Sequence, residues 1–127
     1  MKFDYVFDTF AWIEYFQASK KGEVVKEFLE KHKIATPIIA IAELADSYLR
    51  IGEELGERYD FIIANSTIIN LTPELCIEGA KIKKEMRKLE KDFGLIDGII
   101  YAIAKELKAK LVSGDHHFKN AKDVVFL

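Results

Sequence analysis

The sequence predicts an α/β protein of three layers, with a short, mostly parallel sheet of about four to five strands flanked by helices. The main observation is that short apolar segments of strand length alternate with longer segments whose apolar residues recur at helical spacing. Strands connected through helices run parallel, and helices cover both faces of such a sheet. The chain has 127 residues and half are hydrophobic, so we expect a single domain over residues 1–127.

The first part of the chain predicts one strand and two helices. Residues 3–8 are expected to form a buried strand that ends in Asp8, and Thr9 is expected to cap a short helix directly after it. Residues 18–22 are expected to be a polar break. Residues 23–31 carry apolar residues at helical spacing between charges, which is typical of a surface helix.

The rest of the chain repeats this order. A hydroxyl followed by proline predicts a helix start twice, at Thr36-Pro37 and at Thr72-Pro73, because Thr is a favoured N-cap and Pro a favoured first helical residue. Further strands are expected at residues 33–36, 67–71, 110–113 and 123–126. Further helices are expected at residues 37–51, 54–65, 73–91 and 95–108.

The composition excludes several classes of protein. A formal charge of −2 argues against a protein that coats nucleic acid by neutralising its phosphates. The single cysteine, Cys76, rules out a disulfide framework and is expected to be a small core residue. The chain reaches Asp4 without the apolar region of a signal peptide, and no apolar run approaches the ~18 residues of a membrane span. We therefore expect a soluble cytoplasmic protein without a membrane partner.

One acidic residue lies in a segment that is otherwise apolar. Residues 95–104, LIDGIIYAIA, contain only apolar residues and glycine besides Asp97. A helix that is apolar on nearly every face is a buried helix, where an uncompensated carboxylate is costly. Asp97 is therefore either a helix cap, favoured there by the helix dipole, or part of a functional site.

Three other acids stand in similarly apolar settings. Asp8 and Asp115 follow directly after expected strands, and Glu43 and Asp97 lie early in helices that would start from the same edge of the sheet. Ligands of parallel sheets bind at the carboxyl ends of the strands. We therefore expect the four acids, Asp8, Glu43, Asp97 and Asp115, to converge in one pocket.

Converging carboxylates need a cation, because each one raises the energy of ionising its neighbours. Ligand sets made only of oxygen suit Mg²⁺ or Mn²⁺ better than zinc, which prefers His and Cys. The chemistry typical of such a site is metal-assisted hydrolysis of a phosphodiester, with a water whose pKa the metal lowers. One carboxylate is expected to accept the proton of that water.

The ordered set of acids resembles one family. The residues that carry the resemblance are Asp8-Thr9 after an apolar strand, Glu43-Leu44 in a helix, Asp97 in an apolar helix, and Ser113-Gly114-Asp115 before Phe118. Over essentially the whole chain they resemble the PIN-domain ribonucleases, especially the small VapC-type toxins of prokaryotic toxin–antitoxin pairs. The resemblance implies a PIN-like fold and a Mg²⁺- or Mn²⁺-dependent endoribonuclease that cuts RNA. It also implies a cognate antitoxin protein and a homodimer.

The functional residues of the family carry over position by position. Asp8, Glu43 and Asp97 match its central acids, and Asp115 matches a fourth, more variable one. Thr9 and Ser113 match hydroxyl positions close to the metal, and capping or turn hydrogen bonds explain these two equally well.

Other nearby candidates are left out of the expected site, among them the acids Asp4, Asp46 and Asp92. Asp46 lies one turn beyond Glu43 in the same helix. His116 and His117 are adjacent on a polar loop, where neighbouring side chains usually face apart.

Two other families with an aspartate at the end of a strand do not match the residues around Asp8. A haloacid-dehalogenase-type phosphatase has a second Asp two residues after the first, where this chain has Phe10. A receiver-like domain has an early acidic pair, whereas Phe7 precedes Asp8 here. The remaining alternative is a non-catalytic PIN-like interaction module, whose acidic pocket binds a structural ion or the arginines of a partner.

Overall fold

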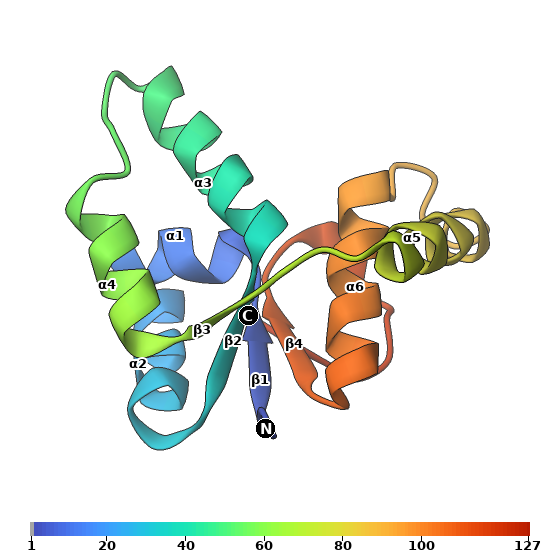
Figure 1. Cartoon of the computed structure of the whole chain (residues 1–127), viewed down its shortest axis with the longest axis horizontal. Coiled ribbons are helices and arrows are strands. Elements are labelled where there is room, and N and C mark those ends of the chain that lie inside the picture. Colours follow the sequence, from blue (N-terminus) through green and yellow to red (C-terminus); the bar gives the residue numbers. More distant parts are fainter. Residues whose placement is uncertain (1) are drawn as a thin grey trace.

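The structure is a computed structural model that describes residues 2–127 (Figure 1). The elements in this range are β1 (Tyr5–Phe7), α1 (Thr9–Gln17), α2 (Lys20–Lys31), β2 (Ile34–Pro37), α3 (Ile38–Arg50), α4 (Glu57–Asn65), β3 (Thr67–Ile69), α5 (Pro73–Met86), α6 (Leu95–Leu107), β4 (Lys110–Ser113), the 3-10 helix η1 (His116–Phe118) and β5 (Val124–Phe126). Among these residues no helix is long and apolar enough to cross a membrane.

The five strands form one parallel sheet in the order β3-β2-β1-β4-β5. This confirms the predicted three-layer α/β fold. The strand β1 lies in the middle, with Val6 opposite Ala35 of β2 and Leu111 of β4. From β1 the chain adds β2 and then β3 on one side, and it later adds β4 and β5 on the other side. The order of the strands therefore reverses beside β1. Ligand sites of open parallel sheets lie at such a reversal.

Two hydrophobic clusters cover the two faces of the sheet. Successive residues of a strand point to opposite faces. Accordingly, Val6 packs in the cluster that contains Ile103 of α6, whereas Phe7 packs in the cluster that contains Trp12 of α1 and Leu44 of α3. Figure 1 shows α1, α2 and α4 on one side of the sheet and α5 and α6 on the other. Burial on both faces explains why the central strand β1 is apolar throughout.

Two glycines let α5 and α6 pack closely. A Cβ atom on Gly98 would lie 2.2 Å from the carbonyl oxygen of Gly79, and one on Gly79 would lie 2.6 Å from the Ile99 side chain. Real Cβ atoms do not approach so closely, so the contact requires glycine at both positions. It places the start of α6, which carries Asp97, against α5.

Two predicted helix caps are wrong. The N-cap of α1 is Asp8, whose side chain accepts a hydrogen bond from the Ala11 N–H, and Thr9 is the first helical residue. The helix α3 begins after Pro37 without a side-chain cap. The hydroxyl of Thr36 is instead buried in the core, where it accepts a hydrogen bond from Trp12 Nε1 at 3.1 Å.

Several predicted boundaries also differ from the structure. The expected break at residues 18–22 belongs largely to α2, because Ser19 caps that helix at Lys20. The helix α5 ends at Met86 rather than near residue 91, and Arg87 Nε then donates to the Phe93 carbonyl oxygen at 2.8 Å. Cys76 is exposed on α5, so its assignment to the core is wrong.

Candidate metal centre

Asp8 lies at the carboxyl end of the central strand and is almost fully buried, with 4% of its surface exposed. Its Oδ1 accepts a hydrogen bond from the Ala11 N–H at 2.9 Å, because Asp8 is also the N-cap of α1. Burial raises the pKa of Asp8 from 3.8 to about 7, the charges of Asp115 and Glu43 add to the increase, and hydrogen bonds from Ser113 and Ala11 oppose it.

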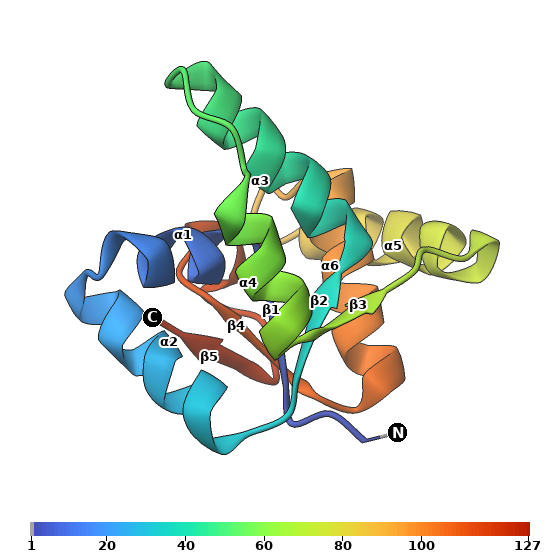
Figure 2. The same ribbon diagram turned by 60° about the vertical axis from the view of Figure 1, so that its left-hand side comes forward.

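Glu43 lies on α3, the helix that leaves the carboxyl end of β2 beside β1. In Figure 2 this helix projects away from the sheet at that edge. Thr9 Oγ1 donates to Glu43 Oε1 at 2.7 Å, so the hydroxyl of Thr9 positions an acid rather than capping a helix. Burial raises the pKa of Glu43, and the charges of Asp97 and Asp115 raise it further.

Asp97 is both a helix cap and a member of the acidic group. It is the third residue of α6, and its Oδ2 accepts from the N–H of the N-cap residue Gly94 at 2.8 Å. The same oxygen lies 2.9 Å from His117 Nδ1. Burial raises the pKa of Asp97, the Gly94 bond and His117 oppose the increase, and Asp115 adds to it. The two interpretations of Asp97 are therefore compatible.

Asp115 follows β4, the strand next to β1. The buried Ser113 at the end of β4 accepts the Asp115 N–H on its Oγ at 3.0 Å, and its hydroxyl also helps to lower the pKa of Asp8. Asp115 Oδ1 in turn accepts the His117 N–H at 3.0 Å and caps η1. The hydroxyl of Ser113 thus links the backbone of one acid to the side chain of another.

The charges of the four acids interact in five of their six pairs. Asp8 is affected by Asp115 and Glu43, Glu43 by Asp97 and Asp115, and Asp97 by Asp115. Within residues 2–127, the ion pairs of the four acids are with histidines, and no Lys or Arg side chain pairs with them. The group therefore has an excess of negative charge that a divalent cation would neutralise.

The donor set fits a hard divalent cation. Each of Glu43, Asp97 and Asp115 has its hydrogen bonds on one carboxylate oxygen, Oε1, Oδ2 and Oδ1 respectively. These bonds restrain the carboxylate groups and leave the second oxygen of each available as a ligand. Carboxylate oxygens are the protein ligands that Mg²⁺ and Mn²⁺ prefer.

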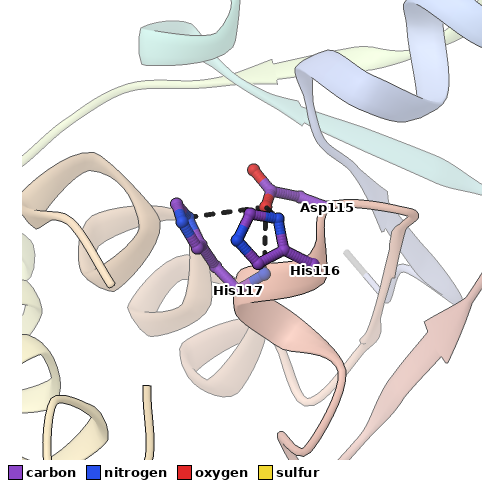
Figure 3. Close-up of side chains that lie close together, drawn as sticks. All are labelled: Asp115, His116 and His117. Carbon is purple, nitrogen blue, oxygen red and sulfur yellow. Dashed lines mark hydrogen bonds and ion pairs between the residues drawn. The ribbon is translucent and has the colours of Figure 1, made fainter. Parts of the chain in front are cut away.

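His117 belongs to this group, although the sequence analysis left it out. Its Nδ1 lies 2.9 Å from Asp97 Oδ2 and 3.4 Å from Asp115 Oδ1. The expectation that His116 and His117 face apart is wrong, because their ring centroids are only 4.3 Å apart (Figure 3). The turn that Asp115 caps brings both rings to the same side. In the sequence, the position of Asp115 directly before the two histidines could have indicated that His117 belongs to the site. Asp46, also left out, pairs with Arg50 on the surface of α3.

The comparisons with known proteins agree on one family and fold. A family model described as PIN domain matches residues 5–124. No curated protein matches the sequence. A toxin–antitoxin complex from Klebsiella pneumoniae is similar, with 23% identity, a TM-score of 0.74 and 96% of each chain covered.

Two further solved structures are similar over nearly their whole length. VapBC2 from Rickettsia felis, bound to a DNA fragment from its promoter, has 16% identity and a TM-score of 0.74, with 97% of this chain and 96% of that chain covered. VapC20 from Mycobacterium tuberculosis, a toxin that cleaves the sarcin-ricin loop, has 14% identity and a TM-score of 0.75, with 95% of this chain and 97% of that chain covered. At such identities the likeness concerns the fold.

Proposed function

The chain belongs to the PIN domain family, and on this premise we propose that it is a Mg²⁺- or Mn²⁺-dependent endoribonuclease, the toxin of a toxin–antitoxin pair. The observation that carries the proposal is the mutual proximity of the four acids at the carboxyl edge of the sheet, without a pairing Lys or Arg among the described residues. Such a site accommodates a cation and, with it, the phosphate of a nucleic acid.

The four acids would hold the cation. When bound, the cation supplies Lewis acidity toward a phosphodiester and lowers the pKa of an attacking water. Asp8 would be a ligand in its ionised form, so metal binding has to displace the proton that burial favours. Thr9 and Ser113 keep Glu43 and Asp8 oriented through their hydroxyl groups. The raised pKa of Glu43 suits it to accept a proton from water.

Two of the similar structures support the proposed substrate and partner. The Mycobacterium tuberculosis toxin cleaves the sarcin-ricin loop, and the Klebsiella pneumoniae structure is a toxin–antitoxin complex. We propose that this chain likewise cuts RNA and is inhibited by a cognate antitoxin protein, and that it acts in the cytoplasm as a homodimer. The near-complete coverage of both chains supports a single nuclease domain over residues 1–127.

The test is cleavage of total cellular RNA by the metal-free protein supplied with Mg²⁺ or Mn²⁺, with EDTA as the reversal and sequencing of the new 5′ ends as the readout. We expect metal-dependent cutting that Asp97→Asn abolishes. The matched control is Asp92→Asn, an exposed acid in the loop before α6 that should cut normally.

Two results would contradict the proposal. Cutting that continues unchanged in Asp97→Asn would overturn the site. If no RNA in the mixture is cut while the protein still binds Mg²⁺ by calorimetry, the chain is the non-catalytic interaction module instead.

A further inference from the structure

Asp115, one of the four acids, and the two histidines that follow it bring one oxygen and two imidazole donors together. Donor atoms of the three side chains lie within 4.8 Å of one another. We propose that these residues form a second cation site, for a transition metal of the zinc class, which shares Asp115 with the group of four acids.

The local turn makes the three side chains converge. Asp115 caps η1, and its Oδ1 accepts the His117 N–H at 3.0 Å. The Nδ1 atoms of His116 and His117 lie 3.7 Å and 3.4 Å from that same oxygen. Figure 3 shows both rings beside the Asp115 carboxylate rather than on opposite sides of the chain. The donors therefore approach one another before any metal binds, and little rearrangement is needed to surround an ion.

The ring of His117 is also held by a second acid. His117 Nδ1 lies 2.9 Å from Asp97 Oδ2, and the N–H of Gly94 donates to that same oxygen. The ring therefore lies between Asp97 and Asp115, with Nδ1 facing both carboxylates. An ion bound to this nitrogen would replace its contact with Asp97.

The donor chemistry separates this site from the group of four acids. Two imidazoles and one carboxylate suit Zn²⁺, whereas Mg²⁺ binds oxygen ligands and loses its water reluctantly. Three protein ligands leave one tetrahedral position open, as in catalytic and inhibitory zinc sites. The His116 side chain is 70% exposed, so an ion can enter from solvent.

The shared residue couples the two sites. A zinc ion on Asp115 would engage a carboxylate that the group of four acids needs for its own cation, and it would bind His117, the partner of Asp97. Zinc should therefore inhibit metal-dependent cleavage at concentrations well below those of Mg²⁺. This consequence rests on the proposed nuclease function, whereas zinc binding itself does not.

The experiment measures zinc affinity directly on untagged, metal-free protein, by competition with a chromogenic chelator and by the visible spectrum of the Co²⁺ form. We expect one ion per chain, with at least tenfold weaker binding in His116→Ala and in His117→Ala. The matched control is His32→Ala, because His32 is remote from the site and pairs with Asp4. Circular dichroism and thermal melts check that each variant folds.

Each outcome separates the two proposals. Histidine-dependent zinc binding without any RNA cleavage supports this site and contradicts the nuclease. Zinc that binds equally well to both histidine variants and to the wild type overturns the site. In the nuclease assay, each protein is compared with its own cleavage rate without zinc. The zinc concentration that halves this rate should be at least tenfold higher for His116→Ala than for the wild type. An unchanged requirement overturns the coupling.

Discussion

His117 Nδ1 lies 2.9 Å from Asp97 Oδ2, which joins the turn after β4 to the first turn of α6. The same carboxylate oxygen accepts the Gly94 N–H, so two donors restrain one oxygen and leave the other available to a cation. The loss of residues that orient metal ligands in this way typically costs about 10–100-fold in metal affinity or activity.

The first prediction concerns the position of this donor. Asn places its amide nitrogen near the position of Nδ1, whereas Gln places it farther out. We expect His117→Asn to retain cleavage within a few-fold and His117→Gln to lose about 10–100-fold, mostly through weaker Mn²⁺ binding in calorimetry. Equal losses in the two variants would contradict a role for the δ-position donor. His116→Asn is the matched control because His116 does not bond to Asp97.

The second prediction separates the charge of Asp97 from its capping bond. In Asp97→Asn the side-chain oxygen can still accept the Gly94 N–H, and a carboxylate repelled by Asp115 is removed. We expect a thermal midpoint equal to or above that of the wild type in metal-free buffer. Asp97→Ala loses the cap and should cost about 1 kcal/mol. A clear loss of stability in Asp97→Asn would show that the charge is compensated in the folded protein.

The third prediction concerns pH. The pKa of Asp8 is about 7 in the folded protein and 3.8 in the reference state, so the folded protein binds the proton more tightly. Its contribution to stability is complete below about pH 4 and is lost as pH rises through 7. One such proton changes the free energy of unfolding by at most about 1.4 kcal/mol per pH unit.

The free energy of unfolding of metal-free protein, measured by chemical denaturation between pH 5 and pH 8, checks this pH dependence. Asp8→Asn keeps the acceptor for the Ala11 N–H, so it should lose stability less steeply with pH and be more stable than the wild type at pH 8. Saturating Mg²⁺ should stabilise the wild type and not this variant. The control is Asp92→Asn, an exposed acid in the loop before α6 that should leave the slope unchanged. Parallel pH profiles for Asp8→Asn and the wild type would contradict the prediction.

The fourth prediction concerns the contact between α5 and α6. Gly98→Ala would place a Cβ atom 2.2 Å from the Gly79 carbonyl oxygen, so the two helices must separate. We expect a loss of about 3 kcal/mol or more in the free energy of unfolding. Glu106→Ala, on the exposed surface of α6, should change it by less than about 0.5 kcal/mol. A Gly98→Ala variant as stable as this control would refute the close packing.

The fifth prediction concerns Thr9, whose hydroxyl donates to Glu43 at 2.7 Å. One such hydrogen bond is worth about 1 kcal/mol, so Thr9→Val should reduce cleavage about fivefold and raise the pKa of Glu43 further. Thr9→Ser keeps the donor and should cut nearly as well as the wild type. If the Thr9→Val and Thr9→Ser variants have the same pH–rate profile, the hydroxyl of Thr9 does not position Glu43.

The order of the elements was predictable from the sequence because it depends on local signals. Apolar runs such as residues 5–7 indicate strands, and the periodic apolar residues of α6 indicate a helix, without reference to distant parts of the chain. The acids that end strands, Asp8 above all, were visible for the same reason. A parallel sheet then requires its carboxyl ends to share one edge, which is why the acids were expected to be close.

The partners of individual polar side chains were decided only by the tertiary structure. Thr9 bonds to Glu43, 34 positions away, and Thr36 to Trp12, 24 positions away, although both hydroxyls had been expected to cap adjacent helices. His117 reaches Asp97 across 20 positions because β4 ends and α6 begins at the same edge of the sheet. Local sequence determines backbone conformation through short-range sterics and periodicity. Side-chain hydrogen bonds depend on which distant groups the packed core brings within about 3 Å, and that distance exists only after folding.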